Sequence, residues 1–287
     1  MHHSLAIVEL IDALQSEDEE THQNAAVELV ELGIQAVDAL LTVVHHPQEH
    51  VRAMAIWALG EMGDVRVLPA LLNALDDDSP RVQEAAVRAL GESGNPDVIE
   101  PLIQKLQSNY SSVRLSAATA LGWISDERSM QAMINVLTQS DDAQLLSRIA
   151  ESLGKLGNHD AVPALIKNLH NSNDWVRMRA ARALGKLADR RAVNDLVHKL
   201  GDQNQWVRYD AALALGEIGS SEALFDLINA LKYDSVPQVR RAAAIALGRM
   251  GDPSAIDALK ACLHDPDDDV LEAIDVALVL LGAPLDA

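Results

Sequence analysis

The chain has 287 residues and a formal net charge of −20, with 23 Lys and Arg against 43 Asp and Glu. This acidic composition excludes nucleic acid and anionic membrane as first partners to consider, because both are bound through basic surfaces. A single cysteine, Cys262, excludes a disulfide framework and a cysteine-based metal cluster. Hydrophobic residues make up 48% of the chain and aromatic residues only 3%, so we expect a core of closely packed Ala, Leu, Val and Ile side chains.

The first element in chain order is a helix pair over residues 4–33, and we expect residues 1–33 to cap the N-terminal end. This pair carries Thr21 where later copies of the pattern carry valine. Terminal units of repeat arrays are often atypical because they cover the exposed end of the shared core. No signal-peptide pattern opens the sequence and no apolar run reaches about 18 residues, which predicts a cytoplasmic protein.

A repeat of 31 or 32 residues follows, and one glycine marks each copy. These glycines are Gly60, Gly91, Gly122, Gly154, Gly185, Gly216 and Gly248. A second glycine often follows three residues later, as at Gly63 and Gly219. Glycine adopts the left-handed conformation at helix ends without steric cost, so each first glycine is predicted to end a helix and to begin a tight turn.

Each period fits a short helix, a polar turn and a longer helix. Residues 161–169 are typical of the short helix, residues 171–174 supply natural N-cap side chains, and residues 175–185 begin the longer helix. The last copy, residues 252–287, is degenerate and is expected to be a C-terminal capping pair. The sequence therefore predicts one all-α domain over residues 1–287, a right-handed α-solenoid of about nine stacked antiparallel helix pairs.

Five copies carry a Val-Arg dipeptide whose valine lies nine residues before the glycine. They are Val51-Arg52, Val113-Arg114, Val176-Arg177, Val207-Arg208 and Val239-Arg240. Across essentially the whole chain the pattern resembles the HEAT repeats, in particular the short Ala-rich subfamily named after phycobilisome lyases. The resemblance implies a superhelix whose second helices line a concave face, with the arginine joining an acidic residue in a ladder between units. The arginine is missing at Gln83, Leu146 and Leu271, where we expect less tightly tied joints.

No catalytic residue is predicted, because the sequence has no G-x-S-x-G elbow and its Gly-x-x-Gly pairs follow helices instead of opening them. The run from His45 to His50 has two interpretations, a divalent-metal chelator or a polar turn. The run is expected to be a loop in which no helix fixes the geometry of an i, i+4 ligand pair, so no metal site is predicted. A HEAT-like enzyme, deoxyhypusine hydroxylase, binds iron through repeated His-Glu dipeptides, and this sequence has none.

Residues near one stripe of each second helix vary between copies, whereas the Ala and Leu positions repeat. They lie three, six and ten residues beyond the motif valine, a spacing that places them close to one face. This variation predicts a partner-binding set on the concave face. The predicted residues are Trp57, Arg88, Trp123, Lys155, Arg179, Arg182, Lys186, Tyr209 and Arg249.

Residues 167–208 hold nine Lys or Arg and four Asp or Glu, a local excess of positive charge in an acidic chain. Trp175 and Trp206 precede adjacent motif valines and are expected to stack near one another at the helix entrances. Trp and Arg are enriched at binding hot spots, so the two indoles could form a helix-entrance binding patch. The other interpretation is that they cover the joint between two units.

The leading hypothesis is a non-enzymatic scaffold or adaptor that binds a protein partner, with an acidic segment, on the concave face and without a cofactor. The alternative, which comes from the resemblance, is a phycobilin lyase or isomerase subunit, or a chaperone that binds a bilin or a phycobiliprotein. A bilin's propionates would then suit Arg179, Arg182 and Lys186, with Trp123 or Tyr209 against its rings. The sequence leaves the oligomeric state open.

Overall fold

The structure is a computed structural model that describes the backbone of residues 2–283 and the side chains of residues 6–283. Over this range the chain is all-α, without a strand, and alternates short first helices with longer second helices. The first helices are α1 (His2–Ala13), α3 (Val37–Val43), α5 (Leu68–Ala74), α7 (Ile99–Lys105), α9 (Glu127–Gln139), α11 (Val162–Asn168), α13 (Val193–Lys199), α15 (Leu224–Tyr233) and α17 (Ile256–Lys260). The second helices are α2 (Glu19–Leu32), α4 (Glu49–Met62), α6 (Pro80–Glu92), α8 (Ser111–Leu121), α10 (Ala143–Leu156), α12 (Asp174–Leu187), α14 (Gln205–Ile218), α16 (Pro237–Met250) and α18 (Asp268–Leu280).

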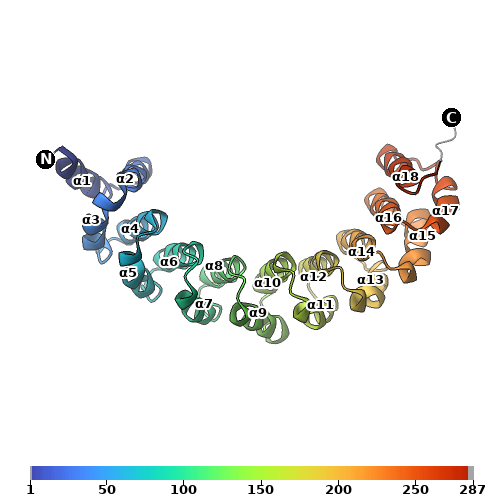
Figure 1. Ribbon diagram of the computed structural model, residues 1–287, viewed down its shortest axis with the longest axis horizontal. Helices are drawn as coiled ribbons and strands as arrows, with labels where there is room; N and C mark the ends of the chain where they lie inside the picture. The colour runs from blue at the N-terminus through green and yellow to red at the C-terminus, as the bar shows by residue number, and fades with distance from the viewer. Residues whose placement is uncertain (1, 284–287) are drawn as a thin grey trace. The chain divides into compact units, whose positions relative to one another are not determined.

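These helices form the stacked pairs of an α-solenoid, which confirms the predicted fold class. The chain divides into two compact units, unit 1 (Met1–Ala132) and unit 2 (Met133–Ala287), with the division inside α9. In unit 1, α2, α4, α6 and α8 pack on one another in order; in unit 2, α10, α12, α14, α16 and α18 do the same (Figure 1). Each second helix also packs on the first helix that precedes it where the pair lies within one unit. α17 and α18 occupy the segment predicted as the C-terminal capping pair, of which residues 284–287 lie outside the described residues.

The glycine that marks each repeat is predicted to end its second helix, and this is correct only at Gly122, which follows the last residue of α8. In the other six copies the glycine lies inside the helix, so the prediction is wrong there. Gly216, for example, precedes the end of α14 by two residues, and a Cβ built on it would lie 2.5 Å from Ala246 Cα on α16. Gly60 has the same role on α4, because its added Cβ would lie 2.4 Å from Ala89 Cβ on α6. These glycines therefore permit close approach of neighbouring second helices, a contact for which any side chain is too large.

The helix ends fall three residues later, at the second glycine. Gly63, Gly157, Gly219 and Gly251 each follow the last residue of a second helix and adopt left-handed φ values between 62° and 72°. Ala188 occupies this place after α12 with φ 50°, the only described non-glycine residue with positive φ. Its Cβ is strained there, since the left-handed region costs an L-residue about 1–2 kcal/mol.

An arginine ladder ties the turns of unit 2 together, as the resemblance implies. The Arg177 side chain donates to both carboxylate oxygens of Asp202, at 2.8 and 2.9 Å, and to the carbonyl of Asn171 at 3.0 Å. Arg208 repeats this arrangement one unit later, with Asp234 as the carboxylate and the Asp202 carbonyl as the third acceptor. Each aspartate thus links two successive arginines. Separately, no described helix is both long and apolar enough to cross a membrane.

Candidate functional site

The predicted binding residues of α12 form a continuous stripe along one face of the helix. Trp175, Arg179, Arg182 and Lys186 are three or four residues apart, so their side chains follow one another along the face. Trp175 is 61% exposed and the side chains of Arg179 and Arg182 are 29% and 46% exposed. The equivalent positions also occur on α10, α14 and α16. On each helix they are the residue before the motif valine, whose place Leu145 takes on α10, and the residues three, six and ten positions after it. We call these positions on the four helices the second-helix stripe of unit 2.

Arg179 joins α12 to α10 through Glu151. The Glu151 carboxylate lies 2.8 Å from Lys155 Nζ, 3.8 Å from Arg148 Nη1 and 3.9 Å from Arg179 Nη1. The hydrogen bond from Lys155 and the charges of these neighbours hold the pKa of Glu151 below its ordinary value, despite partial burial. One carboxylate therefore lies close to three cationic side chains, and the four groups together carry a net positive charge.

Arg182 has a structural contact that the sequence alone does not reveal. Its guanidinium donates to Asp210 on α14 at 2.9 and 3.1 Å, and the Asp210 side chain is only 3% exposed. Burial raises the pKa of Asp210, while the hydrogen bonds from Arg182 act in the opposite direction. Arg182 thus compensates a buried carboxylate through its Nε and Nη2 groups, while its side chain stays 46% exposed.

Lys186 and Arg249 supply the remaining charge of the stripe. Arg249 Nη1 lies 3.5 Å from Glu217 Oε1, and both side chains are largely exposed. Lys186 is exposed and forms no ion pair with any residue that the structure describes. The twelve positions three, six and ten residues beyond the motif valine hold six cations and three carboxylates. The stripe is therefore cationic on a chain whose net charge is −20.

Aromatic side chains lie at the N-terminal end of the stripe. Trp206 is 49% exposed and contacts Tyr209 edge to face, with ring centroids 6.0 Å apart. The predicted stacking of Trp175 on Trp206 is absent from the described ring contacts, because neighbouring second helices are spaced about 8–10 Å apart. Instead, a hydrogen bond between Asp174 and Asn204 links the two helix entrances. About half of Trp206 and more than half of Trp175 stay exposed, so the joint covers each residue only in part. The helix-entrance binding patch stays a prediction.

Unit 1 carries the remaining predicted residues. Trp57 is half-buried and Arg88 exposed, and both line a shallow groove of 290 Å³ that runs over α4, α6 and α8. Trp123 is 52% exposed just beyond the end of α8. The predicted set thus falls into two groups, Trp57, Arg88 and Trp123 in unit 1 and the cationic and aromatic residues in unit 2.

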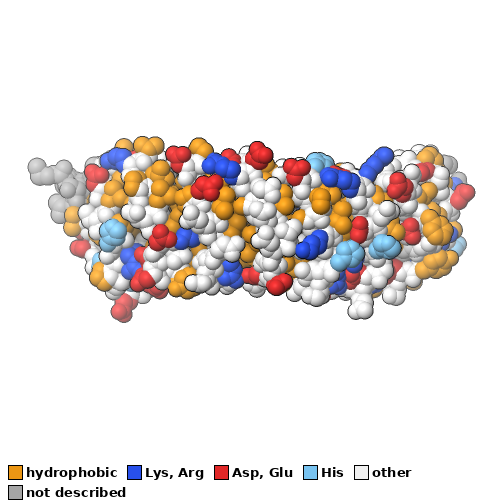
Figure 2. Space-filling view, turned by 90° about the horizontal axis from the view of Figure 1, so that it is seen from below, with side chains coloured by type: hydrophobic (Ala, Val, Ile, Leu, Met, Phe, Trp, Pro, Cys, Tyr) orange, Lys and Arg blue, Asp and Glu red, His pale blue; other side chains and the backbone are white. Residues whose placement is uncertain are grey.

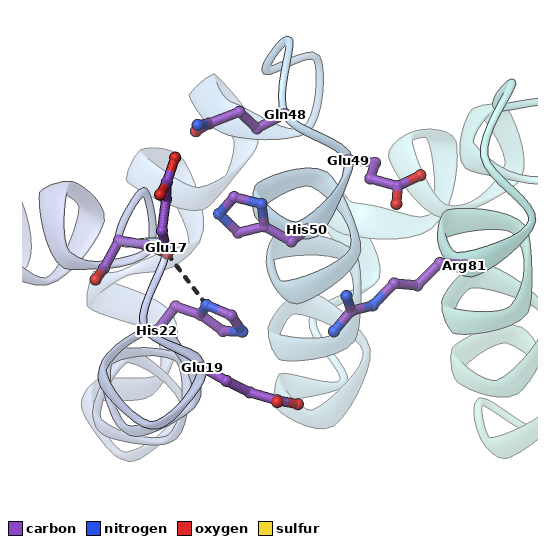
Figure 3. Close-up of a pocket in the computed structure, with 8 residues that line it drawn as sticks. Glu17, Glu19, His22, Gln48, Glu49, His50 and Arg81 are labelled. Carbon is purple, nitrogen blue, oxygen red and sulfur yellow. Dashed lines mark hydrogen bonds between the residues drawn. The ribbon is translucent and has the colours of Figure 1, made fainter.

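The histidine-rich run forms a turn, and one of its histidines meets a residue that the sequence does not single out. His50 faces His22 of α2 with ring centroids 5.1 Å apart, and the Nε2 atoms of both rings are buried without a hydrogen-bond partner (Figure 3). Burial, and then the neighbouring His22, lower the pKa of His50. Between residues 2 and 283 no group of three or more His, Cys, Asp or Glu is placed to hold a metal ion. The contact between His22 and His50 could not be predicted from the repeat pattern, because His22 lies in the degenerate first repeat.

The first helices carry a more mixed surface than the stripe. Figure 2 shows the side on which they lie, where Lys and Arg side chains are interspersed with Asp, Glu, His and apolar side chains. The mixed signs resemble an ordinary solvated surface, which keeps proteins soluble. The second-helix side is therefore the better candidate for recognition.

Comparison with known proteins agrees with this architecture. The family profile of the HEAT repeats matches residues 7–82, 68–144, 130–202 and 193–278. No curated protein matches the chain. Among solved structures, the chain is similar to the YibA protein of Escherichia coli, with 21% identity over 98% of this chain and 96% of that one and a TM-score of 0.58. An engineered protein has 23% identity over 97% and 89% of the two chains and a TM-score of 0.54.

A third similar structure is the complex of CpcE and CpcF of phycocyanin lyase from Nostoc sp., with 22% identity over 85% of this chain and 94% of that one and a TM-score of 0.47. At these identities the likeness to solved structures concerns the fold alone. The family profile, by contrast, spans nearly the whole sequence in four overlapping matches. The chain therefore belongs to the family of HEAT-repeat proteins.

Proposed function

We propose that this chain is a non-enzymatic protein-interaction scaffold, and that the second-helix stripe of unit 2 binds an acidic segment of a partner protein. The observation that supports this most directly is the excess of six cations over three carboxylates on one face of an acidic chain. A local field of this sign attracts carboxylate-rich ligands and orients them during association. Arginines form strong paired hydrogen bonds with carboxylates, which gives such a surface specificity as well as attraction.

The exposed indoles add an apolar anchor to this charge. Trp175 is 61% exposed and Trp206 49% exposed beside the cationic residues. Trp contributes large buried area when a partner covers it and is enriched at the centre of binding hot spots. The preferred ligand is therefore an acidic segment that carries an apolar or aromatic residue.

The contacts of the stripe residues determine which of them can be substituted without disturbing the fold. Arg182 compensates the buried Asp210, so its removal would destabilise the fold and confuse the result. Lys186 has no such partner, and Lys186→Glu reverses its charge at an exposed site. Lys232 is also exposed, but it lies on the first helix α15 and forms no ion pair in the described part of the chain, so Lys232→Glu is a matched charge-reversal control.

The test measures fluorescence polarisation of a labelled peptide, Glu-Glu-Trp-Glu-Glu, against the full chain and both variants. We expect Lys186→Glu to weaken binding by about tenfold, equivalent to 1.4 kcal/mol, with unchanged thermal stability. Lys232→Glu and a Lys-Lys-Trp-Lys-Lys peptide are the controls. Equal effects of the two substitutions would show that general charge, and not the stripe, governs binding, and would overturn the proposal.

The bilin alternative stays a prediction. Arg179, Arg182 and Lys186 do line one recess, but its volume of 10 Å³ is too small to enclose a tetrapyrrole, and Arg182 is engaged with Asp210. Bilin binding would therefore have to occur on the open face. Titration with phycocyanobilin, followed by visible absorption and circular dichroism, distinguishes the alternatives: an induced signal that Lys186→Glu reduces would favour the bilin function.

A further inference from the structure

One repeat of unit 1 lacks a side chain that the other copies supply. The residue just before the left-handed position at the end of each second helix is large and apolar in every described case but one. These residues are Leu32, Met62, Leu156, Leu187, Ile218, Met250 and Leu281, and the exception is Ser93. Leu187, the last residue of α12, is buried with 3% exposure, and the other six are half-buried. The position therefore normally places a large apolar side chain at the edge of the core.

A cavity of 380 Å³ lies beside Ser93, between the ends of α4 and α6 and the start of α5. The apolar residues Val67, Leu68, Leu71 and Ala89 form its floor, and Val67 and Leu71 are each only 3% exposed. The Ser93 hydroxyl donates to the Leu90 carbonyl of its own helix at 2.6 Å and leaves this space open. A volume of this size lies within the range of about 300–1,000 Å³ that is typical of ligand pockets lined mainly by apolar groups.

The mouth of the cavity is acidic. Glu61 and Glu92 line it and are exposed, and neither forms an ion pair with a residue in the described part of the chain. Asp64 also lies at the rim, where Arg66 compensates its charge at 2.8 Å. Val65 is 87% exposed next to the rim and extends the apolar surface outward. An apolar floor below two uncompensated carboxylates suits an apolar side chain flanked by positive charge.

We propose that this cavity is a docking site for a basic segment of a partner protein, which inserts one Leu- or Met-sized side chain where the other repeats supply their own. Lysine or arginine residues on either side of the inserted residue would pair with Glu61 and Glu92. The site lies wholly in unit 1 and prefers the opposite charge from the second-helix stripe of unit 2. It is therefore independent of the function proposed above, and either proposal can fail alone.

Comparison with the other repeats indicates which substitution at Ser93 tests the proposal. Ser93→Leu restores the side chain type found at the other copies and should fill the cavity from within, whereas Ser93→Ala removes only the hydroxyl and leaves it open. The probe is a fluorescein-labelled peptide, Lys-Lys-Leu-Lys-Lys, and the control peptide is Lys-Lys-Ser-Lys-Lys. Both are measured by fluorescence polarisation with the full chain.

We expect the full chain and Ser93→Ala to bind the leucine peptide at least tenfold more tightly than the serine peptide, and Ser93→Leu to lose this preference. Filling the cavity should also raise the thermal midpoint of unfolding by about 2–4 °C. Glu92→Gln should weaken both peptides and reduce the dependence of binding on salt. Absence of a leucine preference, or a preference that survives Ser93→Leu in a variant with a raised midpoint, would overturn the proposal. An unraised midpoint would show that the side chain does not enter the cavity and would overturn it equally.

Discussion

The close contact between Gly60 on α4 and Ala89 on α6 allows a sharp test of how the repeats stack. A Cβ added at Gly60 would lie 2.4 Å from Ala89 Cβ and 3.2 Å from Ala89 Cα. The first distance is more than 1 Å shorter than the optimal carbon–carbon separation of about 3.5–4.0 Å. Overpacking of this kind costs about 1–3 kcal/mol, while replacing a helical glycine by alanine contributes about 1 kcal/mol in the opposite direction. The difference between these two contributions is about 0–2 kcal/mol, so we expect Gly60→Ala to destabilise the fold by up to about 2 kcal/mol.

The obstacle at this site is a side-chain methyl group, so a compensating substitution should relieve it. Ala89→Gly removes that methyl, and the double variant carries the same two residue types with their positions exchanged. The helix-propensity terms then cancel, and we expect the double variant to lie within about 1 kcal/mol of the original chain. At Gly216 the obstacle is backbone, because the added Cβ would lie 2.5 Å from Ala246 Cα. Ala246→Gly should consequently fail to rescue Gly216→Ala.

Urea unfolding, followed by circular dichroism and tryptophan fluorescence, gives the free energies for both double-mutant cycles. The expected coupling energy is about 2 kcal/mol in favour of the exchanged pair at Gly60 and Ala89, and close to zero at Gly216 and Ala246. Equal rescue at the two sites would refute the distinction between side-chain and backbone obstruction. A Gly60→Ala variant that is more stable than the original chain would refute the close approach itself.

Three further predictions concern strain and titration. Ala188→Gly should stabilise the fold by about 1 kcal/mol, measured by urea unfolding, because it removes the strained left-handed alanine at φ 50°; an unchanged or lower stability would contradict the strain. Hydrogen bonds from Arg240 hold the pKa of Asp265 below its ordinary value of 3.8, so this pair stabilises the fold at neutral pH and loses that contribution as the pH falls below about 4. Asp265→Asn should cost about 2 kcal/mol at pH 7 and flatten the acid side of the stability profile. Burial, followed by the nearby His22, lowers the pKa of His50 below 6.5, so stability should fall as the pH drops from 7 to about 5, and His50→Gln should reduce that slope. A slope that His50→Gln leaves intact would assign the effect to other groups.

The two proposed binding surfaces arise in the same way. In each, the repeat supplies the helices, and residues that depart from the repeat supply recognition. Trp206 adds an aromatic ring that most of its counterparts lack, and Lys186 carries a positive charge where Glu61, Glu92 and Glu217 carry a negative one. Ser93 departs by omitting an apolar side chain. Packing dictates the repeating positions, so the positions that escape this constraint are free to serve binding.

The arginine ladder was also accessible from the family pattern. Four motif arginines each pair with an aspartate 25 or 26 residues later, namely Arg52, Arg177, Arg208 and Arg240. The copy without the arginine at Gln83 shows what replaces it. The Gln83 amide donates to the Asp77 carbonyl at 2.6 Å and so retains one contact of the motif without an ion pair. The looser joint expected there stays a prediction.

The sequence by itself determined the helix pairs, their number and their stacking, because a 31-residue period of Ala and Leu positions leaves few ways to bury an apolar face. Only the tertiary structure decided what individual residues do. Gly60 and Gly63 look equivalent in the sequence, yet one admits a neighbouring helix and the other adopts a left-handed turn. Arg182 looks free until Asp210, 28 residues away, is placed against it. These roles depend on distances between atoms that lie a full repeat apart, and a one-dimensional pattern contains the period but not those distances.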